Sequence, residues 1–319
     1  MITDNSIVYS LEGKGLKLNT EDDAKPYVDE IVAVNGLTEI RLAGNTFGVG
    51  AGKAIAAAVA GKVDLKIAAL SDMFTGRLKD EIPLVLEALG DALLDKKHLH
   101  TLDLSDNAFG PAGAKPLQKL LSQNTSIQTL RLNNNGLGIE GGRLIAEALT
   151  LSSTQPTPSS LRTIVCGRNR LESPGAGHLA SAFEALKDTL EEVRMPQNSI
   201  RPEGVVRLAS SLAKCTNLKV LDLQDNTFTE PGSKAIAAAL PNWPNLQHLN
   251  VGDCLLSARG SIEIIKALTS GHESLQRINL AFGEIDPLGA KLIPEMLRNK
   301  ERLEILELNG NAFDPEGEE

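Results

Sequence analysis

The sequence has few aromatic residues and few cysteines, and both shortages limit what kind of protein it encodes. Aromatic residues make up only 3% of the chain and tryptophan occurs once, at Trp243, so the core must consist mainly of aliphatic side chains. The three cysteines, Cys166, Cys215 and Cys254, are odd in number and lack the spacing of metal-ligand or redox pairs. Such cysteine usage favours a reducing compartment.

Signals for export or for membrane insertion are also missing. The sequence contains no signal peptide and no apolar run of about 18 residues. We therefore expect a cytoplasmic protein that does not insert into a membrane. The net charge is −9 and no basic stripe stands out against it, which disfavours a nucleic-acid partner.

The residue groups that catalysis requires are absent from the sequence as well. The five histidines are scattered over the chain, and none has a cysteine or carboxylate cluster beside it that would form a zinc site. The phosphate-binding pattern G-x-x-x-x-G-K-[ST] does not occur, so the chain has no P-loop for a nucleotide. We predict that the chain is not itself an enzyme and that it binds no metal or cofactor of its own.

What the sequence does contain is a repeated apolar pattern, L-x-x-L-x-L-x-x-N, with a period of 28 to 34 residues. The first apolar position of each repeat is occupied by Leu37, Leu65, Leu99, Ile127, Leu161, Leu190, Leu218, Leu246, Leu275 and Leu303. The step of two residues between the last two apolar positions predicts a short strand with one buried face. Alanine- and leucine-rich stretches follow, such as residues 51–59 and 142–149, and predict helices.

A strand and a helix within about 28 residues form the long type of leucine-rich repeat, and such units must stack to bury their apolar faces. We predict an α/β fold, a crescent-shaped leucine-rich repeat solenoid of about 11 repeats, with a parallel sheet on the concave face and helices on the convex face. It should form a single domain over residues 1–319, with a degenerate repeat around residues 15–19. Residues 314–319 resemble the start of an acidic tail, and the polar, proline-containing residues 151–160 predict a flexible surface loop.

An asparagine column ends most of the strands. Its members are Asn45, Asn107, Asn135, Asn169, Asn198, Asn226 and Asn311, and Cys254 takes the same place in another repeat. The side-chain amide should satisfy backbone groups in the turn that leaves each strand, because those groups would otherwise be buried without partners. We therefore interpret this column as structural.

The residue directly before each of these positions should stand on the open rim, where packing does not constrain it. This column consists of Gly44, Asp72, Asp106, Asn134, Arg168, Gln197, Asp225, Asp253, Phe282 and Gly310. Its polar members are free to contact a partner, and we single out Asp72, Asp106, Asn134, Arg168 and Asp225. In the run of three asparagines at 133–135, phase alone assigns Asn135 to the buried column and Asn134 to the rim.

The array breaks its own pattern at residues 71–83. Met73 replaces the column asparagine, and a charged segment with Arg77, Lys79 and Asp80 follows. Because neighbouring parallel strands lie about 5 Å apart, Arg77 and Asn134 should share one rim about 10 Å apart, with their side-chain tips closer than that. A repeat that departs from its neighbours is where function is expected to override packing.

The segment S-D-M-F-T-G-R-L-K-D-E-I-P at residues 71–83 resembles the signature of the RanGAP family, the GTPase-activating proteins of the small GTPase Ran. Residues 104–111, 134–138, 166–172, 200–204, 221–229 and 253–260 are also similar to that family, in a form that looks fungal. The resemblance implies a chain that binds Ran in its GTP form and speeds hydrolysis of the bound GTP. GTP and Mg²⁺ would then be held by the partner.

The resemblance also implies roles for single residues. Arg77 invites an interpretation as an arginine finger, but the family implies an essential cation at the partner surface instead. The residue that matches the family's rim asparagine, Asn134, would orient the glutamine of the GTPase toward the attacking water. Lys79 and Asp80 are candidate partner contacts.

The family further implies a monomer that acts in nucleocytoplasmic transport. A Ran-binding helper protein is a further candidate partner, and the cytoplasmic side of the nuclear envelope is one candidate location. The alternative is a scaffold like ribonuclease inhibitor, which would bind a protein without any catalytic effect. That alternative is less favoured because the predicted concave face has almost no aromatic anchors.

Overall fold

The computed structural model of the chain describes residues 6–313 and shows two compact units. Unit 1 is Met1–Ile164 and unit 2 is Val165–Glu319. The acidic residues predicted to begin a tail, 314–319, lie outside the described residues. None of the helices in the described part is long and apolar enough to cross a membrane.

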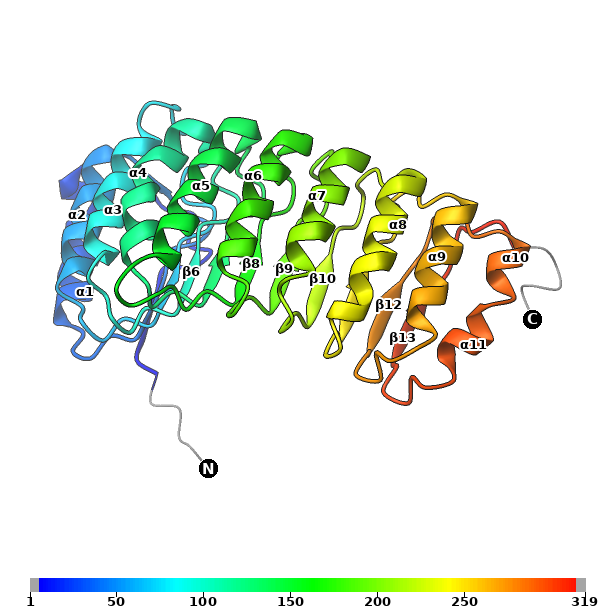
Figure 1. The fold of residues 1–319 in the computed structure, drawn as a ribbon. Coiled ribbons are helices and arrows are strands. Elements are labelled where there is room, and N and C mark those ends of the chain that lie inside the picture. The colour runs from blue at the N-terminus through cyan, green and yellow to red at the C-terminus, as the bar shows by residue number, and fades with distance from the viewer. Residues whose placement is uncertain (1–5, 314–319) are drawn as a thin grey trace. The chain divides into compact units, whose positions relative to one another are not determined.

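In unit 1 each repeat contributes a short strand and a helix (Figure 1). The repeat strands are β1 (Val8–Ser10), β3 (Glu39–Arg41), β5 (Ile67–Ala69), β6 (Thr101–Asp103) and β7 (Thr129–Arg131). The helices are α1 (Glu21–Ala33), α2 (Val49–Ala60), α3 (Ile82–Leu93), α4 (Gly110–Gln123) and α5 (Gly138–Ser153). The strands pair in parallel in the order β1-β3-β5-β6-β7, and the helices pack side by side on one face of this sheet.

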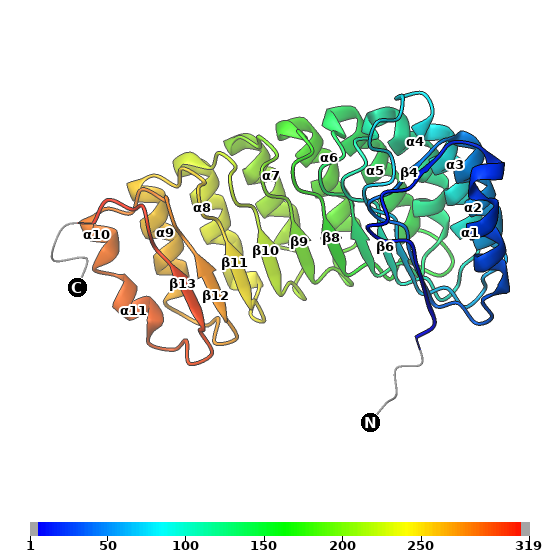
Figure 2. The ribbon, with the colours of Figure 1, turned by 180° about the vertical axis from the view of Figure 1, so that it is seen from behind.

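Unit 2 repeats the same arrangement. Its paired strands are β9 (Glu192–Arg194), β10 (Val220–Asp222), β11 (His248–Asn250), β12 (Arg277–Asn279) and β13 (Ile305–Glu307). Its helices are α6 (Glu172–Ala185), α7 (Pro202–Leu212), α8 (Thr229–Ala239), the short 3-10 helix η1 (Leu240–Asn242), α9 (Ala258–Leu268), α10 (Pro287–Ala290) and α11 (Ile293–Leu297). Strand β8 (Thr163–Val165) includes the boundary between the units. Figure 2 shows the strands of unit 2 from the side opposite its helices.

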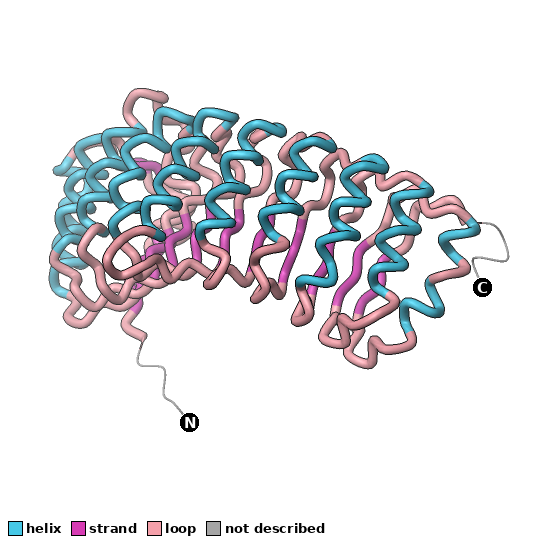
Figure 3. Tube along the Cα trace, viewed as in Figure 1, coloured by secondary structure: helices cyan, strands magenta, loops and turns pink. Residues whose placement is uncertain are grey.

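The alternation of burial within most of the repeat strands confirms the predicted pattern. The middle residue of such a strand, for example Ile40, Leu102 or Val193, is fully buried toward the helices, while its neighbours are on the open face. Turns and loops connect strands to helices at both ends of every repeat (Figure 3). The fold is therefore the α/β leucine-rich repeat solenoid that the sequence predicts, with eleven repeat strands in the described residues.

The position predicted for the first, degenerate repeat is wrong. The strand that joins the main sheet of unit 1 is Val8–Ser10, ahead of the predicted residues 15–19. Residues Lys17–Leu18 instead form β2, which pairs with β4 (Thr46–Phe47) in a separate two-stranded sheet beyond the turns. Leu16 and Leu18, the apolar residues of this segment, therefore belong to the part of the repeat that follows the strand and its turn.

The asparagine column forms the predicted network. Asn107 Nδ2 donates to the carbonyl oxygens of Leu70 (2.8 Å) and Leu104 (2.9 Å), and its Oδ1 accepts from the Met73 backbone N–H (2.7 Å). Met73 itself is buried, as an apolar substitute for the missing asparagine. The Cys254 thiol, in the same place in unit 2, donates to a backbone carbonyl of the preceding repeat at 3.2 Å.

The loop predicted at residues 151–160 is shorter than expected. Helix α5 continues to Ser153, so only residues 154–160 leave regular structure. The Thr154 N–H bonds the Leu151 carbonyl at the helix end, and the Ser160 N–H bonds the Thr125 carbonyl (2.9 Å) of the preceding repeat. The excursion is thus anchored at both ends.

A second column of side chains satisfies carbonyl groups at the end of the preceding repeat's helix. In unit 1, Lys62 Nζ donates to the carbonyls of Val32 (2.9 Å) and Val34 (2.7 Å), and Asn124 Nδ2 donates to that of Leu93 (3.0 Å). These carbonyls lie at or just beyond helix ends, where donors within the helix run out, so a side chain from the next repeat can take the place of water.

His272 is an exception in this column. In unit 2, Trp243 Nε1 donates to the Leu212 carbonyl (2.8 Å) and Lys300 Nζ to the Leu268 carbonyl (2.9 Å). His272 is only 4% exposed, yet neither ring nitrogen has a hydrogen-bond partner in the described part of the chain. Burial lowers the pKa of His272, and the nearby charge of Lys300 lowers it further.

Replacing His272 with asparagine is expected to weaken the pH dependence of stability. The neutral buried ring contributes stability that is complete above the unfolded pKa of about 6.5 and is lost as pH falls from there toward the lower folded pKa. Asparagine suits the site because His272 has a φ of 57°, and Asn124 already fills the equivalent position.

Urea unfolding at about pH 7.5 and about pH 5.5 measures this effect. The midpoint should fall less on acidification in His272→Asn than in the unchanged chain. Lys62→Met serves as a control, because it removes a donor of the same column and leaves His272 in place. An equal fall in the His272→Asn chain and the unchanged chain would contradict the prediction.

Candidate interaction site on the rim of unit 1

The rim residue of each repeat adopts a left-handed backbone conformation. The φ angle is 44° at Asp72, 61° at Asp106 and 53° at Asn134 in unit 1, and 56° at Arg168 and 55° at Asp225 in unit 2. Glycine, asparagine and aspartate tolerate this conformation best. The left-handed backbone therefore explains part of the residue composition of this rim column. From the sequence, that composition is explained by the absence of packing constraints alone. The mixture of Gly, Asn and Asp in one column was the signal for the left-handed backbone.

Asn134 is exposed at the turn that follows β7, whereas Asn135 beside it is fully buried. Its Nδ2 donates to Asp106 Oδ1 of the preceding repeat at 2.9 Å. Because a carboxylate only accepts hydrogen bonds, this contact fixes which end of the Asn134 amide is nitrogen. The Oδ1 atom lies on the other side of the amide, and none of the described residues has a recorded hydrogen bond to it. The predicted division between the two asparagines is confirmed.

Arg77 has its guanidinium hydrogen-bonded within unit 1. Its Nε donates to Thr46 Oγ1 (2.8 Å) and its Nη1 donates to Asn19 Oδ1 (2.6 Å). Its Nη2 donates to the carbonyl oxygens of Leu18 (3.1 Å) and Thr46 (3.0 Å). Since Leu18 belongs to β2 and Thr46 to β4, the side chain bridges both strands of the small sheet.

Gly48 makes room for this arrangement. A Cβ atom at residue 48 would lie 3.0 Å from Arg77 Nη1 and 2.9 Å from the Asn19 carbonyl oxygen, closer than side-chain carbons normally approach. From the sequence, Gly48 is interpreted only as a turn glycine of the repeat. The structure shows that its lack of a side chain also leaves space for the Arg77 guanidinium.

The expectation that the tips of Arg77 and Asn134 approach each other is wrong. The guanidinium extends toward the repeat of β3 and β4, on the far side of β5 from Asn134. Three strand steps separate the repeats of β3 and β7, or about 14 Å. The sequence predicts the shared rim from strand phase, but the direction of a long side chain depends on its acceptors.

The segment between β5 and α3 presents several exposed side chains on the same rim. Lys79 and Asp80 are exposed, and Asp72 Oδ1 accepts a hydrogen bond from Thr75 Oγ1 (2.7 Å). Leu78 is 72% exposed, although a leucine in a leucine-rich repeat is expected to be buried in the core. Sequence reasoning missed Leu78, and only its place outside the repeated apolar positions could have indicated it.

The two rim candidates of unit 2 are exposed as predicted. Arg168 stands at the turn after β8, and Asp225 at the turn after β10. Asp225 Oδ2 accepts from Gln197 Nε2 at 2.7 Å, which repeats the contact between Asn134 and Asp106. No cluster of three or more His, Cys, Asp or Glu side chains in residues 6–313 is arranged to hold a metal ion.

Comparison with known proteins decides the family. The sequence family described as Leucine Rich repeat matches residues 95–117, 123–146 and 214–237. A curated relative from Saccharomyces cerevisiae, "Ran GTPase-activating protein 1", is 38% identical, and the match covers 98% of this chain and 80% of the relative. The chain belongs to the Ran GTPase-activating protein family.

Other relatives show how far the similarity extends. The Ran GTPase-activating protein 1 of Xenopus laevis is 47% identical over 97% of this chain, which spans 54% of that protein's length. The ribonuclease inhibitor of Mus musculus is 25% identical over 62% of this chain and 49% of its own length. Membership of the Ran GTPase-activating protein family therefore rests on nearly full coverage of this chain at much higher identity.

Proposed function

We propose that this chain binds Ran in its GTP form and accelerates hydrolysis of the bound GTP, as an activator that is not itself the enzyme. The names of its relatives support the partner. The observation that supports the mechanism is the exposed Asn134 amide, held by Asp106 with its oxygen available at the rim. GTP and Mg²⁺ would be held by the GTPase, and this chain would supply no reacting group.

In the proposed mechanism Asn134 positions a glutamine of the partner. The free Oδ1 accepts a hydrogen bond from the glutamine side-chain amide, so that the glutamine in turn holds the attacking water in line with the γ-phosphate. Fixing a reacting water in this way removes orientational freedom before the reaction and needs no new charge. A second amide also excludes bulk water from the reaction site.

Arg77 supports a mechanism without an arginine finger. To enter the GTPase site, its guanidinium would have to leave four hydrogen bonds that connect β2, β4 and Asn19. We propose instead that Arg77 acts at the interface as an essential cation. It fastens the segment that presents Leu78, Lys79 and Asp80 to the partner, while its charge remains partly exposed at that surface.

A hydrolysis assay tests the proposed function directly. Ran loaded with GTP is mixed with a small molar fraction of this chain, and release of inorganic phosphate is followed over time. We expect every Ran molecule to hydrolyse its GTP at a rate that increases with the concentration of this chain. Hydrolysis at the intrinsic rate of Ran, with or without stable binding, would reject the proposal.

The binding scaffold without catalytic effect has less support. Side chains on the open strand face pair with one another, as Arg41 Nε does with Glu39 Oε1 (2.5 Å) and Arg194 with Glu192. Protein interfaces that use a large concave face usually depend on aromatic anchors, which these strands lack. The rim of unit 1 is the better candidate for contact.

Replacing Asp106 with alanine is expected to slow hydrolysis at saturating concentrations of this chain. Loss of the carboxylate frees the Asn134 amide to rotate, so it populates the productive orientation less often. One hydrogen bond to a charged group contributes about 1.5–3 kcal/mol, so the saturating rate should fall by about 10- to 100-fold. Asp106 thus acts as a positioning residue for Asn134.

Asp225 provides a matched control for this variant. Asp225→Ala removes the same type of contact, to Gln197, at an equivalent rim position. It should change only the concentration of this chain that gives half the saturating rate. Asp106→Asn should retain part of the rate, since its amide oxygen still accepts from Asn134. A reduced saturating rate in Asp225→Ala, equal to that of Asp106→Ala, would contradict the assigned role of Asp106.

A further inference from the structure

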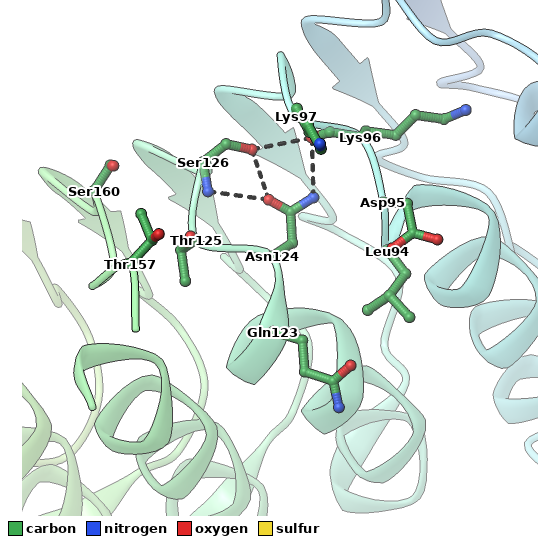
Figure 4. A pocket seen from close by; sticks show the side chains of 10 residues that line it. All are labelled: Leu94, Asp95, Lys96, Lys97, Gln123, Asn124, Thr125, Ser126, Thr157 and Ser160. Carbon is green, nitrogen blue, oxygen red and sulfur yellow. Dashed lines mark hydrogen bonds between the residues drawn. The ribbon is translucent and has the colours of Figure 1, made fainter. Parts of the chain in front are cut away.

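The loop at residues 154–160 borders a pocket of about 520 Å³ in unit 1 (Figure 4). The pocket lies at the edge where helices α3 and α4 end and strands β6 and β7 have not yet begun. Thr157 and Ser160 come from the loop, and Thr125, Ser126 and Lys97 come from the two preceding repeats. Figure 4 shows the loop residues on one side of the pocket and Leu94 and Asp95 on the other.

Thr157 is exposed and has no recorded hydrogen bond in the described structure through either its backbone or its side chain. It stands between Pro156 and Pro158, which cannot donate hydrogen bonds from their backbone nitrogens. Thr157 therefore carries an exposed hydroxyl that another protein can bind without breaking a hydrogen bond of this residue.

The chain contains one other Ser/Thr-Pro dipeptide, Ser173-Pro174, and its hydroxyl residue differs from Thr157 in both exposure and hydrogen bonding. Ser173 and Pro174 lie in the first turn of α6 in unit 2. Ser173 is only 8% exposed, and its Oγ accepts a hydrogen bond from the Arg201 N–H (3.1 Å). The fold therefore makes one dipeptide accessible and protects the other.

The pocket next to Thr157 contains side-chain donors that the fold does not use. No hydrogen bond is recorded for the side chains of Lys97, Thr125 or Ser160 within residues 6–313. In contrast, Lys96 Nζ donates to the Ala60 carbonyl, and its side chain runs away from the pocket (Figure 4). Among the residues that line the pocket, these three side chains offer one ammonium and two hydroxyl groups to an anion, and Asp95 is the one carboxylate.

We propose that Thr157 is a phosphorylation site for a proline-directed protein kinase, with the phosphate held at this pocket by Lys97. In the transfer from MgATP, Thr157 Oγ1 forms a bond to the γ-phosphorus while the bond from that phosphorus to the β,γ-bridging oxygen breaks. ADP leaves with this oxygen and its bonding electron pair, and the hydroxyl proton passes to a base of the kinase. The modification is separate from the proposed function. It lies at the beginning of the strands, whereas Asp106 and Asn134 follow their ends.

Incubation of the full chain with MgATP and a proline-directed kinase tests the site. We expect about one phosphate per chain, mapped to Thr157 by mass spectrometry, and a loss of at least about tenfold in Thr157→Ala and in Pro158→Ala. Synthetic peptides of residues 151–162 and 168–179 should both be modified, while Ser173 in the folded chain should not. Unchanged incorporation in Thr157→Ala would overturn the proposal, as would a folded chain left unmodified when the 151–162 peptide reacts.

Phosphorus NMR of the modified chain tests the role of Lys97. A nearby cation should lower the second pKa of the phosphate below the value of about 6 that it has in the 151–162 phosphopeptide. The Lys97→Gln chain should return that pKa to the peptide value, and Lys115→Gln, on α4, should not. Equal pKa values in the unchanged and Lys97→Gln chains would overturn the assignment of Lys97.

Discussion

Replacing Asn134 with alanine is expected to reduce the hydrolysis rate of Ran-bound GTP, at saturating concentrations of this chain, by about 10²- to 10³-fold. That is the usual loss when one preorganised hydrogen-bonding group is removed from the reacting centre. The partner's glutamine would then lose the Oδ1 acceptor proposed to orient it, while the rest of the surface proposed to bind Ran would stay almost unchanged. Single-turnover phosphate release over a range of activator concentrations separates the two effects.

Two further variants make this result specific to the amide. Asn134→Gly removes the amide and adopts a φ of 53° without strain, so it should lose as much activity as Asn134→Ala with less effect on stability. Asn135→Ala removes the neighbouring amide, which is buried and donates to the Leu104 carbonyl, so it should mainly lower the unfolding midpoint. A saturating rate within about threefold of normal in Asn134→Gly would rule out the positioning role.

Replacing Arg77 with alanine is expected to raise the activator concentration needed for half the saturating rate by about 10- to 100-fold, which is about 1.4–2.8 kcal/mol of binding free energy. The change removes four hydrogen bonds that hold the 74–81 segment against β2 and β4. That segment would then present Leu78 and Lys79 in many orientations and lose binding free energy when it becomes ordered. The saturating rate should change by less than about tenfold.

An arginine finger predicts the opposite pattern for Arg77. Its removal would reduce the saturating rate by about 10³- to 10⁵-fold. Hydrogen exchange provides a structural control, because Arg77→Ala should increase exchange at the amides of Thr46 and Gly48, which bond across the small sheet. Leu78→Ala, which keeps the guanidinium contacts, should weaken binding without this increase. A fall of about three orders of magnitude in the saturating rate of Arg77→Ala, with unchanged hydrogen exchange at Thr46 and Gly48, would establish Arg77 as an arginine finger.

The fold was predictable because each repeat has the same physical requirements for burial and backbone hydrogen bonding, so the same residue types recur many times. Nearly all of the repeat strands bury their middle residue, and the outgoing turns need partners for their backbone groups, so residues like Leu102 and Asn107 recur along the chain. The prediction failed at the first repeat, where β1 has no column asparagine to mark it. A single degenerate repeat gives too few constraints to fix its register.

The candidate site was predictable only in part. Strand phase separated the exposed Asn134 from the buried Asn135, because side-chain direction in a strand and its turn follows from position alone. The partners of the site residues did not follow from phase. The contact of Asp106 with Asn134 and that of Gly48 with Arg77 each join residues of different repeats. The exposure of Leu78 does not follow from strand phase either.

The sequence by itself determined the repeat, the α/β solenoid and the rim positions, because periodic burial leaves a periodic pattern. Only the tertiary structure decided where long side chains go. Arg77 turns toward Leu18 and Thr46, 59 and 31 residues away in the chain, because one guanidinium can donate to the carbonyls of both strands of the small sheet. The fold decides which hydrogen-bond acceptors from distant parts of the chain lie within reach of a long side chain. A local sequence pattern contains no information about their positions.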